Sequence, residues 1–126
     1  MKRLIAIGLA FLVFSGCAKT IYNWGSYEDD LYRYYKSSKT QEDRERYMSQ
    51  LSSLIEKSGV NGRTVPPGIY AEYGYGLYQA GKYEEAILYF EKERSLWPEA
   101  RPLMERIISN VRTIMAEKEK TSLKNK

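Results

Sequence analysis

Residues 66–99 constrain the fold of this chain most, because turn-forming residues divide them into two short helical segments. Pro66 and Pro67 provide a rigid start for a helix, Gly81 marks a tight turn, and Pro98 ends a second helix. Between these points apolar side chains recur at helical spacing. The stretch therefore predicts one helical hairpin.

Two glycines lie inside the first helix of this hairpin, Gly74 and Gly76. Each glycine in a helix interior costs up to about 1 kcal/mol relative to alanine. Close approach of a neighbouring helix is the usual reason for such a cost. We therefore expect a packed hairpin rather than a free surface helix.

Two further helices are predicted before the hairpin. The first follows Ser26, its expected N-cap, and extends to Ser38. The second begins after Thr40, where Asp43 three positions later approximates a capping box, and ends at Gly59.

A last helix is predicted after the hairpin, with Pro102 in its first turn. Its apolar stripe consists of Leu103, Met104, Ile107, Ile108, Val111, Ile114 and Met115. The residues that follow are mainly charged. We therefore expect a helical domain over 27–118 and a disordered charged tail over 119–126.

Residues 1–16 have the pattern of a cleaved secretory signal peptide. Lys2 and Arg3 precede an apolar run over 4–14, which is too short to be counted as a spanning helix. Small residues follow, immediately before Cys17. Without Lys2 and Arg3, the formal charge falls from +4 to +2.

Cys17 is the only cysteine of the chain. The sequence Phe-Ser-Gly-Cys over 14–17 resembles the lipobox of bacterial lipoproteins, whose cysteine is lipidated and becomes the mature N-terminus; Phe14 stands where leucine is usual. Lipidation would explain an unpaired cysteine in an exported chain, whereas an ordinary signal peptide would leave a free thiol. The absence of Asp at Ala18 resembles lipoproteins sorted to the outer membrane, so we expect an anchor on its periplasmic face.

Residues 17–26 are predicted to be the lipidated cysteine and a short tether. The nine residues after Cys17 extend at most about 30 Å, which keeps the domain near the bilayer. Tyr22 and Trp24 lie in this tether. They would either sit among lipid headgroups or pack on the first helix.

The hairpin resembles the tetratricopeptide repeat, a 34-residue helix-turn-helix unit. The matching positions are Tyr70, Gly74, Gly81, Tyr83, Ala86, Phe90 and Pro98. Tyr73 and Glu93 depart from it, because leucine and alanine are usual there. A shift of 43 positions aligns a degenerate earlier copy, pairing Tyr27 with Tyr70, Tyr35 with Tyr78, and Tyr47 with Phe90. The resemblance implies an all-α fold of two tetratricopeptide-like hairpins plus a capping helix.

In the repeat family, the first helix of each hairpin lines a concave groove. The residues that the resemblance places there are Tyr32, Tyr35, Lys36, Tyr75, Tyr78 and Gln79. Tyrosines on one face would form a rigid amphipathic surface for a peptide or protein partner. The alternative is a core built from tyrosine, since the chain has 12 tyrosines and 3 phenylalanines.

The sequence lacks the residues that several classes of function require. The chain has no histidine and one cysteine, so Ser/His and Cys/His catalysis and ordinary zinc or haem sites lack their ligands. No phosphate-binding glycine motif is present. The acidic pairs Asp29-Asp30 and Glu84-Glu85 lie at predicted helix starts, where they favour the helix dipole. We expect no enzyme, no metal and no cofactor, and the charge of +2 after export disfavours nucleic acid.

Over most of its length the sequence resembles a family of small bacterial outer-membrane lipoproteins of unknown function. The resemblance lies in the lipobox, the tyrosine-rich first helix, VPPGIYAEYG at 65–74 and LYQAGKYEEAI at 77–87. Such proteins are typically encoded beside a lipoprotein similar to the curli secretion channel and a third small lipoprotein. The resemblance implies these two as partners, in an export or envelope assembly.

The leading hypothesis is therefore a lipid-anchored periplasmic adaptor that binds another envelope protein. Two alternatives stay open. Tyrosines that stack on sugar rings would suit a peptidoglycan- or glycan-binding lipoprotein. An unmatched hairpin edge near 27–35 would suit self-association.

Overall fold

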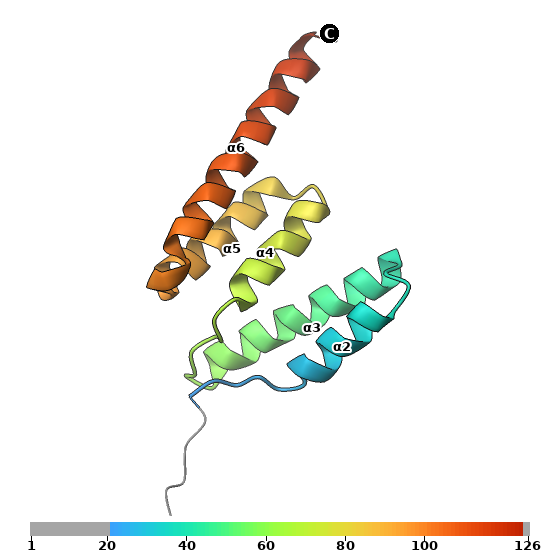
Figure 1. The fold of residues 1–126 in the computed structure, drawn as a ribbon, viewed down its shortest axis with the longest axis vertical. Coiled ribbons are helices and arrows are strands. Elements are labelled where there is room, and N and C mark those ends of the chain that lie inside the picture. The colour runs from blue at the N-terminus through green and yellow to red at the C-terminus, as the bar shows by residue number, and fades with distance from the viewer. Residues whose placement is uncertain (1–20, 125–126) are drawn as a thin grey trace, which may run out of the picture.

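The computed structural model describes residues 21–124, and this part of the chain contains five α-helices and one short 3-10 turn (Figure 1). The elements are α2 (Tyr27–Lys36), α3 (Gln41–Val60), α4 (Ile69–Gln79), α5 (Tyr83–Leu96), η1 (Pro98–Ala100) and α6 (Arg101–Lys124). The predicted all-α class is confirmed. The predicted signal peptide at 1–16 and the lipidation site Cys17 lie outside the described residues.

The helices pack in chain order. α2 packs on α3, α4 packs on α5, and α6 covers α5 on the side away from α2 and α3 (Figure 1). The contact between α3 and α4 joins the first hairpin to the second. The described residues therefore form two helical hairpins followed by a covering helix.

The predicted capping box forms at the start of α3. Thr40 Oγ1 accepts the backbone N–H of Asp43 at 3.2 Å, and Asp43 Oδ2 accepts the backbone N–H of Thr40 at 3.1 Å. Ser26 also lies at the N-cap of α2, but its hydroxyl caps no helix N–H. It donates instead to Asp30 Oδ2 at 2.7 Å.

The start of α4 differs from the prediction. The helix begins at Ile69, after Gly68, whose φ of 89° lies in the left-handed region that favours glycine. Glu93 of α5 supplies the missing cap, because its Oε1 accepts the backbone N–H of Gly68 at 2.6 Å. Burial raises the pKa of Glu93, and backbone N–H groups of α4 partly offset this. The glutamate that departs from the repeat pattern thus holds the two helices of the hairpin together.

The core consists of two clusters. The first lies between α4, α5 and α6 and contains Leu77, Ala86, Phe90, Met104, Ile108 and Val111. The second lies around α3 and the start of α4 and contains Tyr47, Leu51, Leu54, Val65 and Ile69. Met48 and Tyr73 pack against both clusters and so connect the hairpins.

The two helical glycines face different neighbours. A Cβ at Gly74 would lie 3.0 Å from Phe90 Cε1 and 3.2 Å from the carbonyl oxygen of Ala86, within the same hairpin. A Cβ at Gly76 would overlap Met48 Sδ, on the preceding hairpin. The prediction that these glycines permit close approach is confirmed at both positions.

The predicted disordered tail is corrected by the structure. α6 is helical through Lys124, whereas the sequence predicted a domain end at 118 and a disordered tail over 119–126. Glutamate and lysine are good helix formers, and adding residues to an existing helix needs no new nucleation. α6 therefore projects beyond the other helices (Figure 1). Residues 125–126 lie outside the described residues.

The described part of the predicted tether, residues 21–26, packs on the helical domain. Tyr22 forms an isolated parallel bridge with Thr64, and its ring lies 5.7 Å from the ring of Trp97. The ring of Trp24 lies 5.5 Å from that of Tyr27. Of the two readings of these aromatics, the structure favours packing against the protein.

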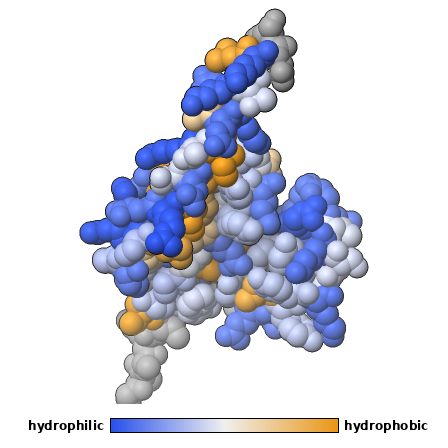
Figure 2. Space-filling model, turned by 45° about the horizontal axis from the view of Figure 1, so that its top comes forward, coloured by the Kyte–Doolittle hydropathy of each residue, from blue (hydrophilic) through white to orange (hydrophobic). Residues whose placement is uncertain are grey.

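No helix among the described residues is long and apolar enough to cross a membrane. In the view of Figure 2, hydrophilic side chains cover most of the surface and apolar side chains form smaller areas between them.

Candidate functional site

A cavity of about 250 Å³ opens between α2, α3 and α4. It is lined by Tyr34, Tyr35, Lys39, Arg44, Tyr47, Met48, Leu51, Glu72, Tyr75, Gly76 and Gln79. We call it the tyrosine groove. Residues from three helices and from the α2–α3 turn meet there, so only the packed fold creates it.

The groove brings together half of the residues that the sequence predicted for it. Tyr35 from α2 and Tyr75 from α4 line it and are 64% and 55% exposed, and Gln79 lines it one turn after Tyr75. These tyrosines are therefore not core residues.

The other three predicted residues lie elsewhere, which corrects the prediction. Tyr32 and Lys36 contact each other on the surface of α2, where Lys36 Nζ donates to the Tyr32 hydroxyl at 3.2 Å. Tyr78 packs against the first core cluster, with its ring 5.6 Å from that of Tyr83. Tyr32 and Tyr78 each lie three positions from a groove residue on the same helix, which points them about 60° away from it. The ring of Tyr78 nevertheless stacks on that of Tyr75, with ring centroids 6.1 Å apart.

Glu72 lines the groove and accepts two hydrogen bonds from tyrosines. Its two oxygens accept the hydroxyls of Tyr27 at 2.7 Å and Tyr47 at 2.8 Å. Burial, and then this carboxylate, raise the pKa of Tyr27 to about 12 and raise that of Tyr47 well above its ordinary value. Tyr34 stacks on Tyr47 with ring centroids 4.6 Å apart, which makes this side of the groove rigid.

The mouth of the groove carries two cations. The Arg44 guanidinium donates to the Lys39 carbonyl at 2.6 Å and to Gln41 Oε1 at 2.9 and 3.3 Å. The Lys39 ammonium lies 5.0 Å from the centre of the Tyr35 ring. Within residues 21–124, neither cation takes part in an ion pair.

Neither cation was among the predicted site residues, because no local pattern links the α2–α3 turn or the start of α3 to the groove. Lys39 has a φ of 53°, a left-handed conformation that costs a residue with a Cβ about 1–2 kcal/mol. The bond from Arg44 to the Lys39 carbonyl helps to hold it. The capping box at Thr40 and Asp43 was the sequence signal that located the end of this turn.

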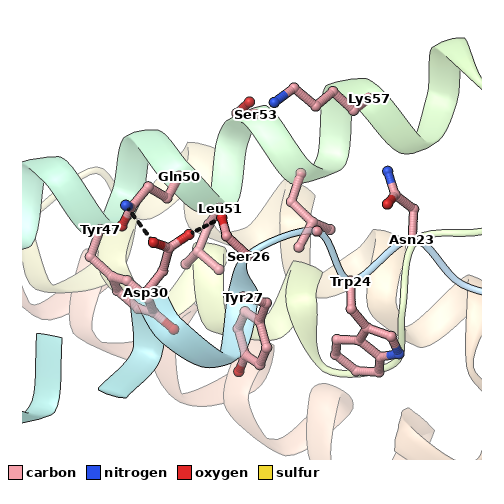
Figure 3. Close-up of a pocket in the computed structure, with 12 residues that line it drawn as sticks. Asn23, Trp24, Ser26, Tyr27, Asp30, Tyr47, Gln50, Leu51, Ser53 and Lys57 are labelled. Carbon is pink, nitrogen blue, oxygen red and sulfur yellow. Dashed lines mark hydrogen bonds between the residues drawn. The ribbon is translucent and has the colours of Figure 1, made fainter. Parts of the chain in front are cut away.

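A second cavity, of about 170 Å³, lies between the tether, α2 and α3 (Figure 3). Its buried carboxylate, Asp30, accepts hydrogen bonds from Ser26 Oγ and Gln50 Nε2, which Figure 3 shows as dashed lines. Each is 2.7 Å long. It also accepts a hydrogen bond from the Arg33 guanidinium at 2.9 Å. This network joins the start of α2 to α3, and we assign it a structural role.

Among residues 21–124, no cluster of three or more histidine, cysteine, aspartate or glutamate side chains is arranged to hold a metal ion.

The fold and the groove define a small all-helical domain with an open, tyrosine-lined groove. The chain belongs to the family of the domain of unknown function DUF4810, whose model matches residues 21–107. The match covers the segment 21–26, α2 to α5 and the start of α6, and so includes every residue of the groove. No curated protein and no solved structure matches the chain.

The exposed and the packed tyrosine of α4 are expected to respond differently to truncation. Tyr75→Ala should change the free energy of unfolding by less than about 0.5 kcal/mol, because this ring lies at the surface. Tyr78→Ala should lower it by about 2 kcal/mol, because this ring packs on the core. Urea unfolding of both variants checks this, and equal losses would contradict the assignment of Tyr75 to the groove.

Proposed function

We propose that this protein is a lipid-anchored adaptor on the periplasmic face of the outer membrane, and that it binds another envelope protein through the tyrosine groove. The observation that carries the proposal is the groove itself, in which two tyrosines from separate helices stay more than half exposed beside a packed core. Such rigid amphipathic rings are typical of protein-binding surfaces. The proposal includes no catalytic step, cofactor or metal.

The anchor in this proposal is a lipid on Cys17. Ile21 lies four positions after Cys17, so the first described residue would lie within about 14 Å of the lipidated position. The α2–α3 turn, which carries Lys39, is on the opposite side of the domain from the point where the tether enters (Figure 1). An anchored domain would therefore offer the groove to periplasmic partners.

We further propose that the hairpins are tetratricopeptide-like. The close approach of Gly74 to Phe90, the left-handed turn at Gly81 and the covering helix α6 are consistent with that architecture. By resemblance, the proposed partners are a curli-channel-like lipoprotein and a third small lipoprotein.

The test is capture of partners from native membranes with the full chain, tagged at its C-terminus and solubilised in mild detergent. The parent should enrich one or both proposed lipoproteins. The double variant Tyr35→Ala/Tyr75→Ala should lose at least about 90% of that enrichment, a loss of about 1.4 kcal/mol or more. Tyr32→Ala is the matched control, since it removes an equally exposed ring of α2 outside the groove.

Two results would overturn the proposal. One is the absence of any enriched envelope protein with the parent chain. The other is an equal yield from the double variant. A Cys17→Ala chain tests the anchor separately, because it should leave the membrane fraction while keeping its fold.

A second candidate, glycan binding, is favoured by the exposure of the rings of Tyr32, Tyr35 and Tyr75, which are 64%, 64% and 55% exposed. Such rings could stack on sugars. Sedimentation with purified sacculi distinguishes the candidates, because a protein adaptor should stay in the supernatant.

A further inference from the structure

Around the tyrosine groove, the acidic side chains have hydrogen-bond or ion-pair partners, whereas the basic side chains that line it have no ion-pair partner among the described residues. Its carboxylate, Glu72, accepts two tyrosine hydroxyls. The neighbouring acids at the start of α3 are also occupied: Glu42 pairs with Arg46, Asp43 belongs to the capping box, and Glu45 accepts the amide of Gln41. Arg44 and Lys39, by contrast, take part in no ion pair within the described part of the chain. The lining carries these two cations and one carboxylate, so its formal charge is +1 and favours an anion.

Arg44 is also held in place before any ligand arrives. Its bonds to Lys39 O and Gln41 Oε1 position the guanidinium and leave one N–H on each terminal nitrogen for a further acceptor. A planar guanidinium held in this way suits a carboxylate, because it can donate two parallel hydrogen bonds. Preorganisation also reduces the entropy lost on binding.

The remaining walls of the groove are amphipathic or apolar. Tyr35 and Tyr75 stand at its sides, and Met48 and Leu51 contribute apolar surface. The volume of about 250 Å³ is smaller than the roughly 300–1,000 Å³ of a typical small-molecule site. It suits side chains of a peptide.

We propose that the tyrosine groove binds an acidic protein segment, in which a carboxylate pairs with Arg44 and Lys39 and an adjacent apolar side chain packs between Tyr35 and Tyr75. This inference rests on the proposed adaptor function and names the chemistry of its partner. The charge complementarity that carries it comes from the groove alone.

The test uses the full chain in detergent micelles and two capped peptides. The probe is acetyl-Gly-Asp-Leu-Asp-Phe-Asp-Gly-amide, and its counterpart carries Asn at each Asp. Calorimetric titration should give at least tenfold tighter binding of the acidic peptide. Raising the salt from 50 to 300 mM should weaken that binding severalfold, because the pairs lie at an exposed mouth.

Matched variants separate the groove from general charge. Arg44→Gln and Arg46→Gln each remove one positive charge from α3, but only Arg44 lines the groove. Arg44→Gln should weaken binding at least tenfold and Arg46→Gln less than twofold. Arg44→Lys should recover only part of the affinity, because it keeps the charge and loses the planar donor pair. Thermal melting of each variant checks that it is folded.

Three outcomes would overturn the inference. They are equal binding of the acidic and the amide peptide, equal losses in Arg44→Gln and Arg46→Gln, and no binding of the acidic peptide at 1 mM. If the last occurs while Tyr35 and Tyr75 are still needed to capture an envelope protein, the adaptor function stands and only the acidic chemistry fails. If partner capture fails as well, the proposed function fails with it.

Discussion

In the Phe90→Ala variant, the free energy of unfolding is expected to fall by about 4 kcal/mol, and the melting temperature by roughly 20 °C. Phe90 is 1% exposed and lies in the cluster that joins α4, α5 and α6. Its removal leaves a cavity that the surrounding helices cannot fill completely. Urea unfolding followed by circular dichroism measures the loss.

The control for this variant is Leu88→Ala on the same helix. Leu88 is 61% exposed, so its truncation should change stability by less than about 0.5 kcal/mol. Phe90→Leu, with an expected loss of about 1 kcal/mol, keeps the comparison measurable if Phe90→Ala does not fold. A loss below 1 kcal/mol in Phe90→Ala would contradict the central place of this ring.

A double-mutant cycle tests the contact between Phe90 and Gly74. In the parent, Gly74→Ala should be destabilising, although alanine is the better helix former by about 1 kcal/mol, because the added Cβ would lie 3.0 Å from the Phe90 ring. In the Phe90→Ala background the ring contact is gone and only the 3.2 Å approach to the Ala86 carbonyl oxygen remains, so the substitution should be clearly less destabilising than in the parent. Additive effects would mean that the two positions do not limit each other.

Glu72→Leu is expected to lower the free energy of unfolding by about 3 kcal/mol, because the hydroxyls of Tyr27 and Tyr47 both lose their charged acceptor. Glu72→Gln should lose less, since its carbonyl oxygen still accepts. Glu84→Leu is the matched control, because Glu84 lies exposed on α5. If Glu72→Leu is no less stable than this control, the two hydrogen bonds contribute nothing measurable to the fold.

The same substitution should change stability at high pH. The pKa of Tyr27 is raised from 10.0 to about 12, and that of Tyr47 is raised as well, so the folded protein holds these protons more tightly than the unfolded chain. Their stabilisation is fully present below pH 10 and is lost as the pH rises through the folded pKa values. In the parent, the free energy of unfolding should therefore fall between about pH 10 and 12. In Glu72→Leu it should fall less steeply with pH.

Local patterns predicted most of the helices because the signals for them act over a few residues. The capping box at Thr40 and Asp43 formed as expected. The turn at Gly81 has a φ of 77°, a conformation that glycine adopts without strain. The misses arose where a distant side chain decided the outcome. α4 begins at Ile69 rather than at the prolines, and Glu93, 25 positions after Gly68, caps it.

The candidate site was predictable only in part for the same reason. The resemblance selected Tyr35, Tyr75 and Gln79, which line the groove, but also Tyr32, Lys36 and Tyr78, which do not. Helical spacing tells which residues share a face, but not which face a neighbouring helix covers. Tyr78 is packed because α5 and α6 form the core beside it, and Tyr75 is exposed because the first hairpin leaves a gap there.

The sequence alone thus determined an all-helical chain, the places where its helices turn, and the two glycines at which helices touch, because these depend on backbone preferences and short-range spacing. Only the tertiary structure decided which tyrosines remain exposed and that Glu72 accepts the hydroxyls of Tyr27 and Tyr47. It also decided that Arg44 and Lys39 meet at one groove, where neither forms an ion pair with any residue of 21–124. These properties depend on the packing of α2, α3 and α4, which brings together residues far apart in the chain.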